Sequence, residues 1–173
     1  QMDFAYSRVA RHQQNIALTD RIATLSGPGY ERVALSSGGS EAMEIAIKFV
    51  RQYVVATGQP ERRHLLTCQP SYHGGTIATL GMSGDEALGD FFDGFGMTSH
   101  KVPAPLTYRL PKPHTPESYA KFALDALEAK IHELGPDTVL AFVMEPVGGL
   151  ATGCTVPLPA YFEGIREICS RHG

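Results

Sequence analysis

The sequence lacks three features, and each absence excludes a class of protein. Its three cysteines, Cys68, Cys154 and Cys169, form no CxxC pair, which argues against a zinc site or a thioredoxin-type redox motif. The net charge of −3 provides no basic field to attract nucleic acid or an anionic membrane surface. No apolar run approaches the ~18 residues of a membrane span, and residues 1–15 lack the apolar core of a signal peptide. We therefore expect a cytoplasmic protein with free thiols.

What the chain does have is enough apolar sequence for a core. Of its 173 residues, 43% are hydrophobic and 19% are charged, which is a globular composition. The length fits one domain, and the sequence contains no internal repeat, low-complexity segment or domain boundary. Because position 1 is not Met and the chain stops at Gly173, directly after a predicted helix, we expect residues 1–173 to be a single partial domain of a longer polypeptide.

Predicted helices and apolar strands alternate along the chain. Helical spacing of apolar residues predicts helices over residues 15–25, 40–57, 118–134 and 159–171. Short apolar runs predict strands over residues 32–36, 64–68 and 138–144. We expect irregular structure at 87–97 and along the proline-rich stretch 102–118. Continuous apolar strands separated by helices indicate an α/β fold, with a mostly parallel sheet covered by helices on both faces.

Two of the predicted helices have a defined apolar face. On the helix over 40–57 this face consists of Ala42, Ile45, Ala46, Phe49, Val50 and Tyr53. On the helix over 118–134 it consists of Phe122, Leu124, Leu127, Ile131 and Leu134. We expect these two faces to be buried.

The clearest junction in the sequence is SSGGSEA, residues 36–42, where a predicted strand gives way to a helix. The first N–H groups of a helix have no internal partner, and the helix dipole places partial positive charge there. Glycines let the backbone approach an anion closely, and a serine hydroxyl adds a hydrogen bond. A plain serine N-cap after a flexible turn explains the loop equally well. The loop matches neither the GK[ST] of a Walker loop nor GxGxxG.

Two further motifs follow predicted strands, at the expected carboxyl edge of the sheet. SYHGGT, residues 71–76, offers an aromatic ring for stacking, although a turn with an exposed Tyr is an alternative. MEPVGG, residues 144–149, ends an apolar strand in Glu145, which needs a partner if buried; a strand-terminal Glu before a proline turn is the alternative. No spaced ligands around His73 support a metal. Because all three motifs follow predicted strands, they should meet at one edge, as a phosphate cradle, a stacking aromatic and a carboxylate for a phosphorylated aromatic cofactor.

The order of these motifs resembles the large domain of class III aminotransferases. The resemblance is carried by SGGSEAMEIAIK, then SYHGGT, then MEPVGGLATG followed by PLPAYFEGIREICSRHG. These are pyridoxal-phosphate (PLP) enzymes of fold type I, and they include omega-amino-acid:pyruvate, acetylornithine and diaminopelargonate aminotransferases. The likeness runs along nearly the whole chain, which corresponds to the middle part of a family member.

The resemblance implies cofactor contacts for five residues. Gly39 and Ser40 would hold the PLP phosphate, and Tyr72 would stack on the pyridine ring with His73 as its companion. Glu145 would lie near the ring's 3-hydroxyl side. The resemblance also implies a homodimer, with an amino donor and a keto-acid acceptor as substrates.

Two residues that the family uses for its chemistry have no counterpart in the sequence. One is the Asp that pairs with the pyridine nitrogen and keeps the ring an electron sink; the other is the Lys that forms the Schiff base and moves the proton. The five lysines fall on predicted helices or in the proline-rich stretch, at Lys48, Lys101, Lys112, Lys121 and Lys130. We therefore expect the parent protein to be a PLP-dependent aminotransferase, and this chain alone to be inactive, with no catalytic residue of its own.

Two alternatives stay open. A PLP-dependent aminomutase or decarboxylase would share the same loops. A non-catalytic module that binds phosphate or protein would explain the missing Asp and Lys, although the intact cofactor loops favour a truncated enzyme. A serine hydrolase is disfavoured, because GMSG at residues 81–84 is not GxSxG.

Overall fold

The computed structural model describes residues 11–85, 87, 91–92 and 94–173. The chain divides into two compact units, residues 1–38 and 39–173, and each is described by itself. The single domain expected over residues 1–173 stays a prediction.

The described part of the first unit contains helix α1 (Gln13–Ser26), close to its predicted bounds. His12 caps this helix, since its Nδ1 accepts a hydrogen bond from the Asn15 N–H at 3.1 Å. The strand predicted over residues 32–36 is wrong, because this segment has no regular structure. A strand needs a hydrogen-bonded neighbour, and within the described chain this segment pairs with none; Leu35 is 44% exposed.

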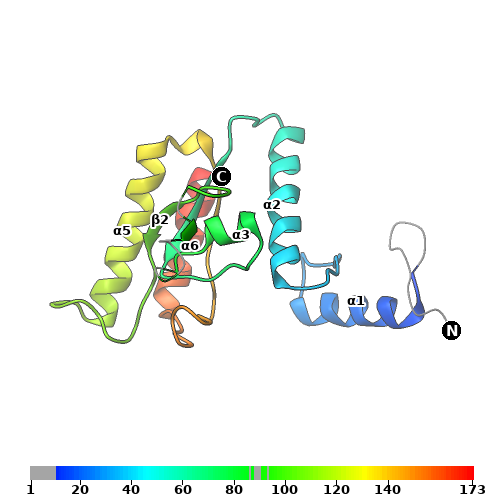
Figure 1. The fold of residues 1–173 in the computed structure, drawn as a ribbon, viewed down its shortest axis with the longest axis horizontal. Coiled ribbons are helices and arrows are strands. Elements are labelled where there is room, and N and C mark those ends of the chain that lie inside the picture. The colour runs from blue at the N-terminus through cyan, green and yellow to red at the C-terminus, as the bar shows by residue number, and fades with distance from the viewer. Residues whose placement is uncertain (1–10, 86, 88–90, 93) are drawn as a thin grey trace. The chain divides into compact units, whose positions relative to one another are not determined.

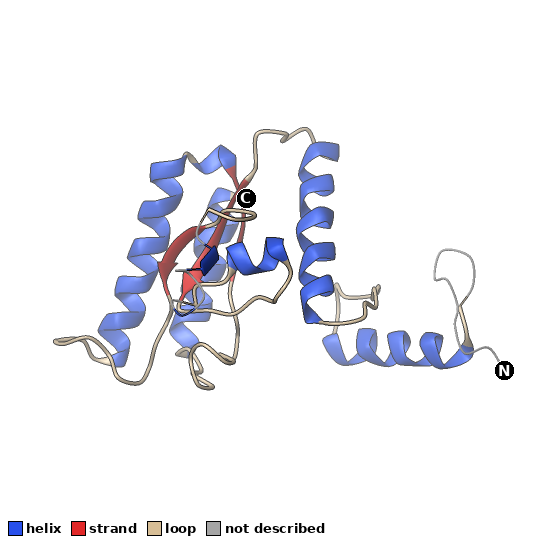
Figure 2. Ribbon diagram, viewed as in Figure 1, coloured by secondary structure: helices blue, strands red, loops and turns tan. Residues whose placement is uncertain are grey.

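A parallel three-stranded sheet organises the second unit (Figures 1 and 2). Its strands lie in the order β2 (His100–Pro103), β1 (His64–Gln69), β3 (Val139–Val143). In the middle strand, Leu66 lies opposite His100 of β2 and Phe142 of β3. The predicted strands over 64–68 and 138–144 are confirmed with small shifts in their ends. The sequence did not predict β2, whose four residues, HKVP, include a single aliphatic side chain.

Helices cover both faces of this sheet, as expected (Figure 2). Helices α5 (Pro116–Leu134) and α6 (Pro159–His172) pack on the side of Leu66, where Tyr161 is fully buried. Helices α2 (Gly39–Ala56) and α3 (Ile77–Met82) pack on the opposite side, where Leu65 and Met82 are buried. Because successive side chains of a strand point to opposite faces, β1 supplies residues to both cores. A 3-10 turn, η1 (Pro136–Thr138), links α5 to β3.

Helix α2 buries a different stripe from the predicted one. The residues that form its core side are Met43, Ile47, Val50 and Val54. Five residues of the predicted face remain exposed, namely Ala42, Ile45, Ala46, Phe49 and Tyr53. The helix carries two apolar stripes, and spacing alone does not show which of them the sheet will cover.

Helix α5 follows its prediction more closely. Leu127 and Ile131 are buried as expected, whereas Phe122 is 43% exposed. Residues 104–115, before this helix, are irregular as predicted, and the predicted stretch 87–97 lies partly outside the described residues. The three cysteines all fall within the described chain and are free thiols. No described helix is both long and apolar enough to cross a membrane.

The buried position of Leu127 gives a stability prediction. Leu127 is 0% exposed in the core between α5, α6 and the sheet. Leu127→Ala should lower the free energy of unfolding by about 2–5 kcal/mol, because it removes buried methyl groups and leaves a cavity. Leu150→Ala is the control, since Leu150 is 79% exposed and its truncation should cost under ~0.5 kcal/mol. Urea-induced unfolding measures both, and equal losses for the two variants would contradict this core.

Candidate functional site

The three motifs meet around one cavity of about 560 Å³. Its walls come from the start of α2, the loop after β1 and the end of β3. All five residues predicted to contact the cofactor line it, namely Gly39, Ser40, Tyr72, His73 and Glu145. The parallel sheet explains two of the walls, since the segments after β1 and β3 emerge at the same edge.

The first wall is the N-terminus of α2, which begins at Gly39. The motif follows an irregular segment rather than the predicted strand, so the sheet does not place it directly. A Cβ built on Gly39 would meet no atom within 4 Å, so this position opens onto free space. The N–H groups of the first turn lack helical partners and carry the positive end of the helix dipole. This wall therefore favours an anion.

Ser40 ties this helix end to the loop after β1. Its Oγ accepts a hydrogen bond from the Gly75 N–H at 3.0 Å, which leaves the hydroxyl proton to donate to a ligand. One turn further along α2, Glu44 Oε1 accepts a hydrogen bond from Thr76 Oγ1 at 2.7 Å. Two adjacent polar contacts thus hold α2 against the loop that carries Tyr72.

Glu145 joins the other two walls. Its Oε1 accepts a hydrogen bond from the Tyr72 N–H at 3.3 Å, so the end of β3 and the loop after β1 are linked across 73 residues of sequence. The carboxylate is half-buried, and its other oxygen remains an acceptor. The Tyr72 side chain is 36% exposed. The site thus presents an aromatic side chain and a carboxylate next to each other.

His73 adds a neutral imidazole to the same cavity. Its Nε2 is buried and has no hydrogen-bond partner among the described residues. Burial, reinforced by the positive charge of Lys101, lowers the pKa of His73 to about 4. The ring is therefore neutral at physiological pH. A buried polar atom without a protein partner is commonly satisfied by a ligand or a water.

The chain matches the family model for class-III aminotransferases over residues 1–173. It belongs to this family. The chain is 41% identical to the hypotaurine/taurine–pyruvate aminotransferase of Paracoccus denitrificans over 151 residues, which are 84% of this chain and 31% of that protein. It is 34% identical to the diaminobutyrate–2-oxoglutarate transaminase of Halomonas elongata, over 93% of this chain and 35% of that protein. The chain therefore spans about a third of the length of these relatives.

Solved structures agree with the sequence relatives. A PLP-bound amine transaminase from an uncultivated Pseudomonas species superposes with a TM-score of 0.83 at 32% identity, over 95% of this chain and 37% of that chain. An omega-aminotransferase from Paracoccus denitrificans has the same TM-score, 0.83, at 27% identity, over 95% of this chain and 36% of that chain. The predicted family and the predicted α/β fold of PLP-dependent transferases are confirmed.

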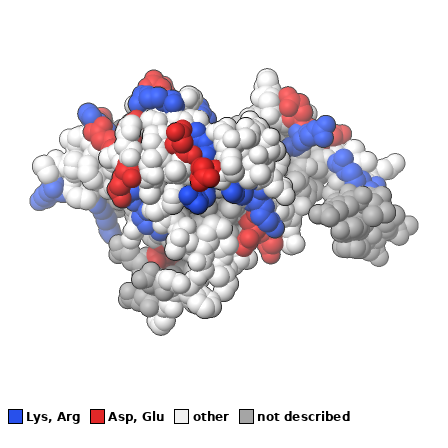
Figure 3. All heavy atoms as spheres, turned by 90° about the horizontal axis from the view of Figure 1, so that it is seen from above, with Lys and Arg blue, Asp and Glu red and all other residues white. Residues whose placement is uncertain are grey.

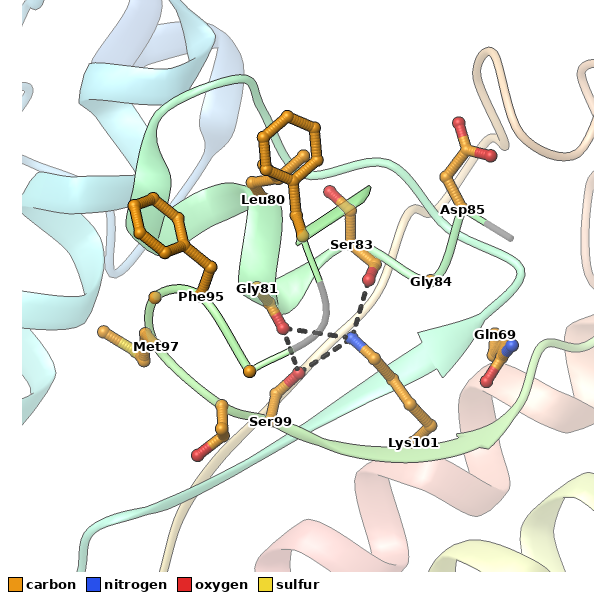
Figure 4. A pocket seen from close by; sticks show the side chains of 14 residues that line it. Gln69, Leu80, Gly81, Ser83, Gly84, Asp85, Phe95, Met97, Ser99 and Lys101 are labelled. Atoms are coloured by element: carbon orange, nitrogen blue, oxygen red, sulfur yellow. Dashed lines mark hydrogen bonds between the residues drawn. The ribbon is translucent and has the colours of Figure 1, made fainter. Parts of the chain in front are cut away.

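A second cavity of this class-III aminotransferase chain, about 320 Å³ in volume, contains Lys101 (Figure 4). Lys101 lies on β2, and not on a helix or in a proline-rich loop as expected. Its Nζ donates hydrogen bonds to the Met82 and Ser83 carbonyls, at 2.6 and 2.8 Å, and to Ser99 Oγ at 2.8 Å. The ammonium group thus caps the C-terminus of α3, where the helix dipole favours a cation.

The hydrogen bonds of Lys101 also stabilise the wall of the first cavity that carries His73. Ser83, whose carbonyl accepts from Lys101, also accepts a hydrogen bond from the His73 N–H through its Oγ, at 2.8 Å. Lys101 therefore holds the turn that holds His73. Sequence reasoning missed this role, because the contacts bring together three separate segments and no local pattern marks them.

Gly74 should be the least replaceable glycine of the site. Its φ of +137° is unfavourable for other residues, and a Cβ would lie 2.6 Å from Ser40 Oγ and 2.6 Å from Thr79 Oγ1. Gly74→Ala should therefore lower the free energy of unfolding by about 1–3 kcal/mol. Gly75→Ala is the matched control, since the nearest atom to its Cβ, Tyr72 Oη, lies 3.8 Å away. Urea-induced unfolding compares the two variants, and equal losses would contradict the close packing at Gly74.

Lys101 should make stability rise with pH. Burial lowers its pKa in the folded protein from 10.5 to about 8. Between these values the unfolded chain binds more protons than the folded chain, so stability increases with pH. Lys101→Met removes this titration. Urea-induced unfolding at about pH 7.5 and about pH 9.5 should show wild type gaining stability relative to the variant. The difference in the free energy of unfolding between wild type and Lys101→Met should grow between these two pH values. If it stays constant or decreases, the burial of the Lys101 amine is contradicted.

Proposed function

We propose that the protein to which this chain belongs is a PLP-dependent aminotransferase that moves an amino group from an amine or amino acid to a keto acid. The observation that carries the proposal is the convergence of SGGS, SYHGG and MEPV on one cavity. The relatives are named for different amino donors, namely hypotaurine or taurine and diaminobutyrate. We therefore propose the reaction class, which is amino transfer to a keto acid, and no particular amino donor.

The residues around the cavity fit PLP. Its volume of about 560 Å³ lies within the ~300–1,000 Å³ typical of small-molecule sites. An anionic phosphate suits the α2 N-terminus, where Gly39 leaves open space and the Ser40 hydroxyl has a proton to donate. A flat ring suits the half-exposed Tyr72.

PLP, when bound, serves as an electron sink for the carbanion formed beside the amino group. The chain's own residues bind and orient. The α2 N-terminus and Ser40 would bind the phosphate, and Tyr72 would hold the ring by stacking. Glu145, anchored by the Tyr72 N–H, would accept a hydrogen bond from a polar substituent or a water on the 3-hydroxyl side of the ring. None of these residues is proposed to transfer a proton in the reaction.

We also propose that these 173 residues do not catalyse transamination by themselves. Among the described residues that line the cavity there is no lysine. Lys101, a partly buried lysine, directs its Nζ to the backbone at the end of α3. The Schiff-base Lys and the Asp for the pyridine nitrogen would come from parts of the protein outside these residues.

A cytoplasmic homodimer is part of the same proposal. The family resemblance supports the dimer, and the free thiols support a reducing compartment. Basic and acidic side chains are interspersed on the face shown in Figure 3, which supports small-molecule rather than nucleic-acid partners.

There are two alternatives to an aminotransferase. One is a PLP-dependent aminomutase or decarboxylase of the same fold, and the other is a non-catalytic binding module. The relatives named above are all aminotransferases, which favours amino transfer. Adding an amino acid without a keto-acid acceptor to the intact protein distinguishes them. A transaminase changes its absorption spectrum and releases one equivalent of ketone or aldehyde, a mutase releases an isomer, a decarboxylase releases CO₂, and a binding module releases nothing.

Ser40 tests the phosphate assignment. Ser40→Glu should abolish PLP binding by the intact protein, because a carboxylate would occupy the phosphate position and repel the phosphate. Ser40→Ala should weaken binding by about tenfold or more, the value of a hydrogen bond to a charged group. Equilibrium titration with PLP measures both. Ser170→Glu, which adds the same charge to an exposed position on α6, is the control and should bind as wild type does. Unchanged affinity in Ser40→Glu would overturn the assignment.

A further inference from the structure

A second group of ligand-type side chains lies on α5 and α6, and it shares no residue with the two cavities described above. Glu128 and His132 are one turn apart on α5, and His172 is the last residue of α6. One ligand atom of each residue lies within 4.8 Å of the other two. Both imidazoles direct Nε2 at the same carboxylate oxygen, Glu128 Oε1, at 3.4 Å from His132 and 2.6 Å from His172.

This donor set matches a divalent transition metal. Two imidazoles and one carboxylate form a three-ligand zinc set that leaves a fourth position for water. With zinc–ligand bonds of about 2.0–2.2 Å, tetrahedral ligands lie about 3.3–3.5 Å apart. The His132–Glu128 separation of 3.4 Å already meets this value. The His172–Glu128 separation would have to open by under ~1 Å as the metal replaces the proton that now joins the two groups.

The backbone of one ligand, His172, is held in place before any metal binds. Arg62, which is 7% exposed, donates hydrogen bonds to the His172 carbonyl at 2.9 Å and to the Val139 carbonyl at 2.9 Å. It therefore ties the end of α6 to the start of β3. Both His132 and His172 also lie in the last turn of their helices, where the helix dipole is negative and attracts a cation.

Arg171 has one favourable and one unfavourable effect on metal binding by Glu128, His132 and His172. Its Nη1 donates to Glu128 Oε2 at 2.9 Å, which leaves Oε1 facing the two imidazoles. The hydrogen bond from His172 and the charge of Arg171 lower the pKa of Glu128, so the carboxylate is ionised and able to bind a metal. The positive charge of Arg171 also repels a cation, so the site should be of modest affinity.

We propose that Glu128, His132 and His172 form a zinc-type metal site that links the C-terminal turns of α5 and α6. The sequence indicated no metal, because the third ligand lies 40 residues after the second. Spacing on one helix reveals only the Glu128 and His132 pair. The site makes no use of the PLP cavity, so its test is independent of the proposed function.

The test is calorimetric titration of the intact, metal-free protein, without a polyhistidine tag, with Zn²⁺ alone. One zinc ion per chain should bind to wild type, and His132→Gln or His172→Gln should abolish this binding. Arg171→Gln should tighten it by about tenfold or more, since a repulsive neighbour is removed. Zinc should also raise the thermal unfolding midpoint of wild type and not that of His132→Gln.

Two control variants separate this site from other zinc ligands. His114→Gln removes a histidine from the segment before α5, and Cys154→Ser removes an exposed thiol. Both should bind zinc as wild type does. Absence of saturable binding, binding that survives His132→Gln and His172→Gln, or binding lost in Cys154→Ser would each overturn the proposal.

Discussion

The parallel pairing of β1 with β2 on one side and β3 on the other is the constraint on which the rest of the structure depends. It brings the segments after β1 and β3 to the same edge, which places Tyr72 beside Glu145 although 73 residues separate them. It also sends alternate side chains of β1 to opposite faces, so that Leu65 packs toward α2 and α3 while Leu66 packs toward α5 and α6.

The sheet by itself does not complete the cavity, because the SGGS segment follows no strand. Polar contacts between α2 and the loop after β1 complete the cavity instead. Ser40 Oγ receives the Gly75 N–H, and Ser83 Oγ receives the His73 N–H, so the loop after β1 is held from two sides. Lys101 holds Ser83 in place by donating a hydrogen bond to the Ser83 carbonyl. The proposed cofactor residues therefore depend on neighbours that touch no cofactor, and substitutions at those neighbours should disturb binding through the loop.

Local signals made much of this predictable. Helical periodicity and glycine or proline boundaries located the four long helices, and continuous apolar runs located β1 and β3. Features that depend on tertiary partners were missed. Residues 32–36 are apolar enough for a strand but have no partner in the described chain, whereas HKVP has little strand character and is paired to β1. The site motifs were recognised because each is contiguous, while the roles of Lys101 and His172 arise only from packing.

The proposed function depends on the α2 N-terminus, which would receive the phosphate of PLP in the cavity formed with the loop after β1 and the end of β3. A crystal structure of the intact protein with PLP tests it most directly. We expect a phosphate oxygen within hydrogen-bonding distance of Ser40 Oγ and of a first-turn N–H of α2, with the pyridine ring stacked on Tyr72. A phosphate bound in the Lys101 cavity, or anywhere away from the start of α2, would contradict it.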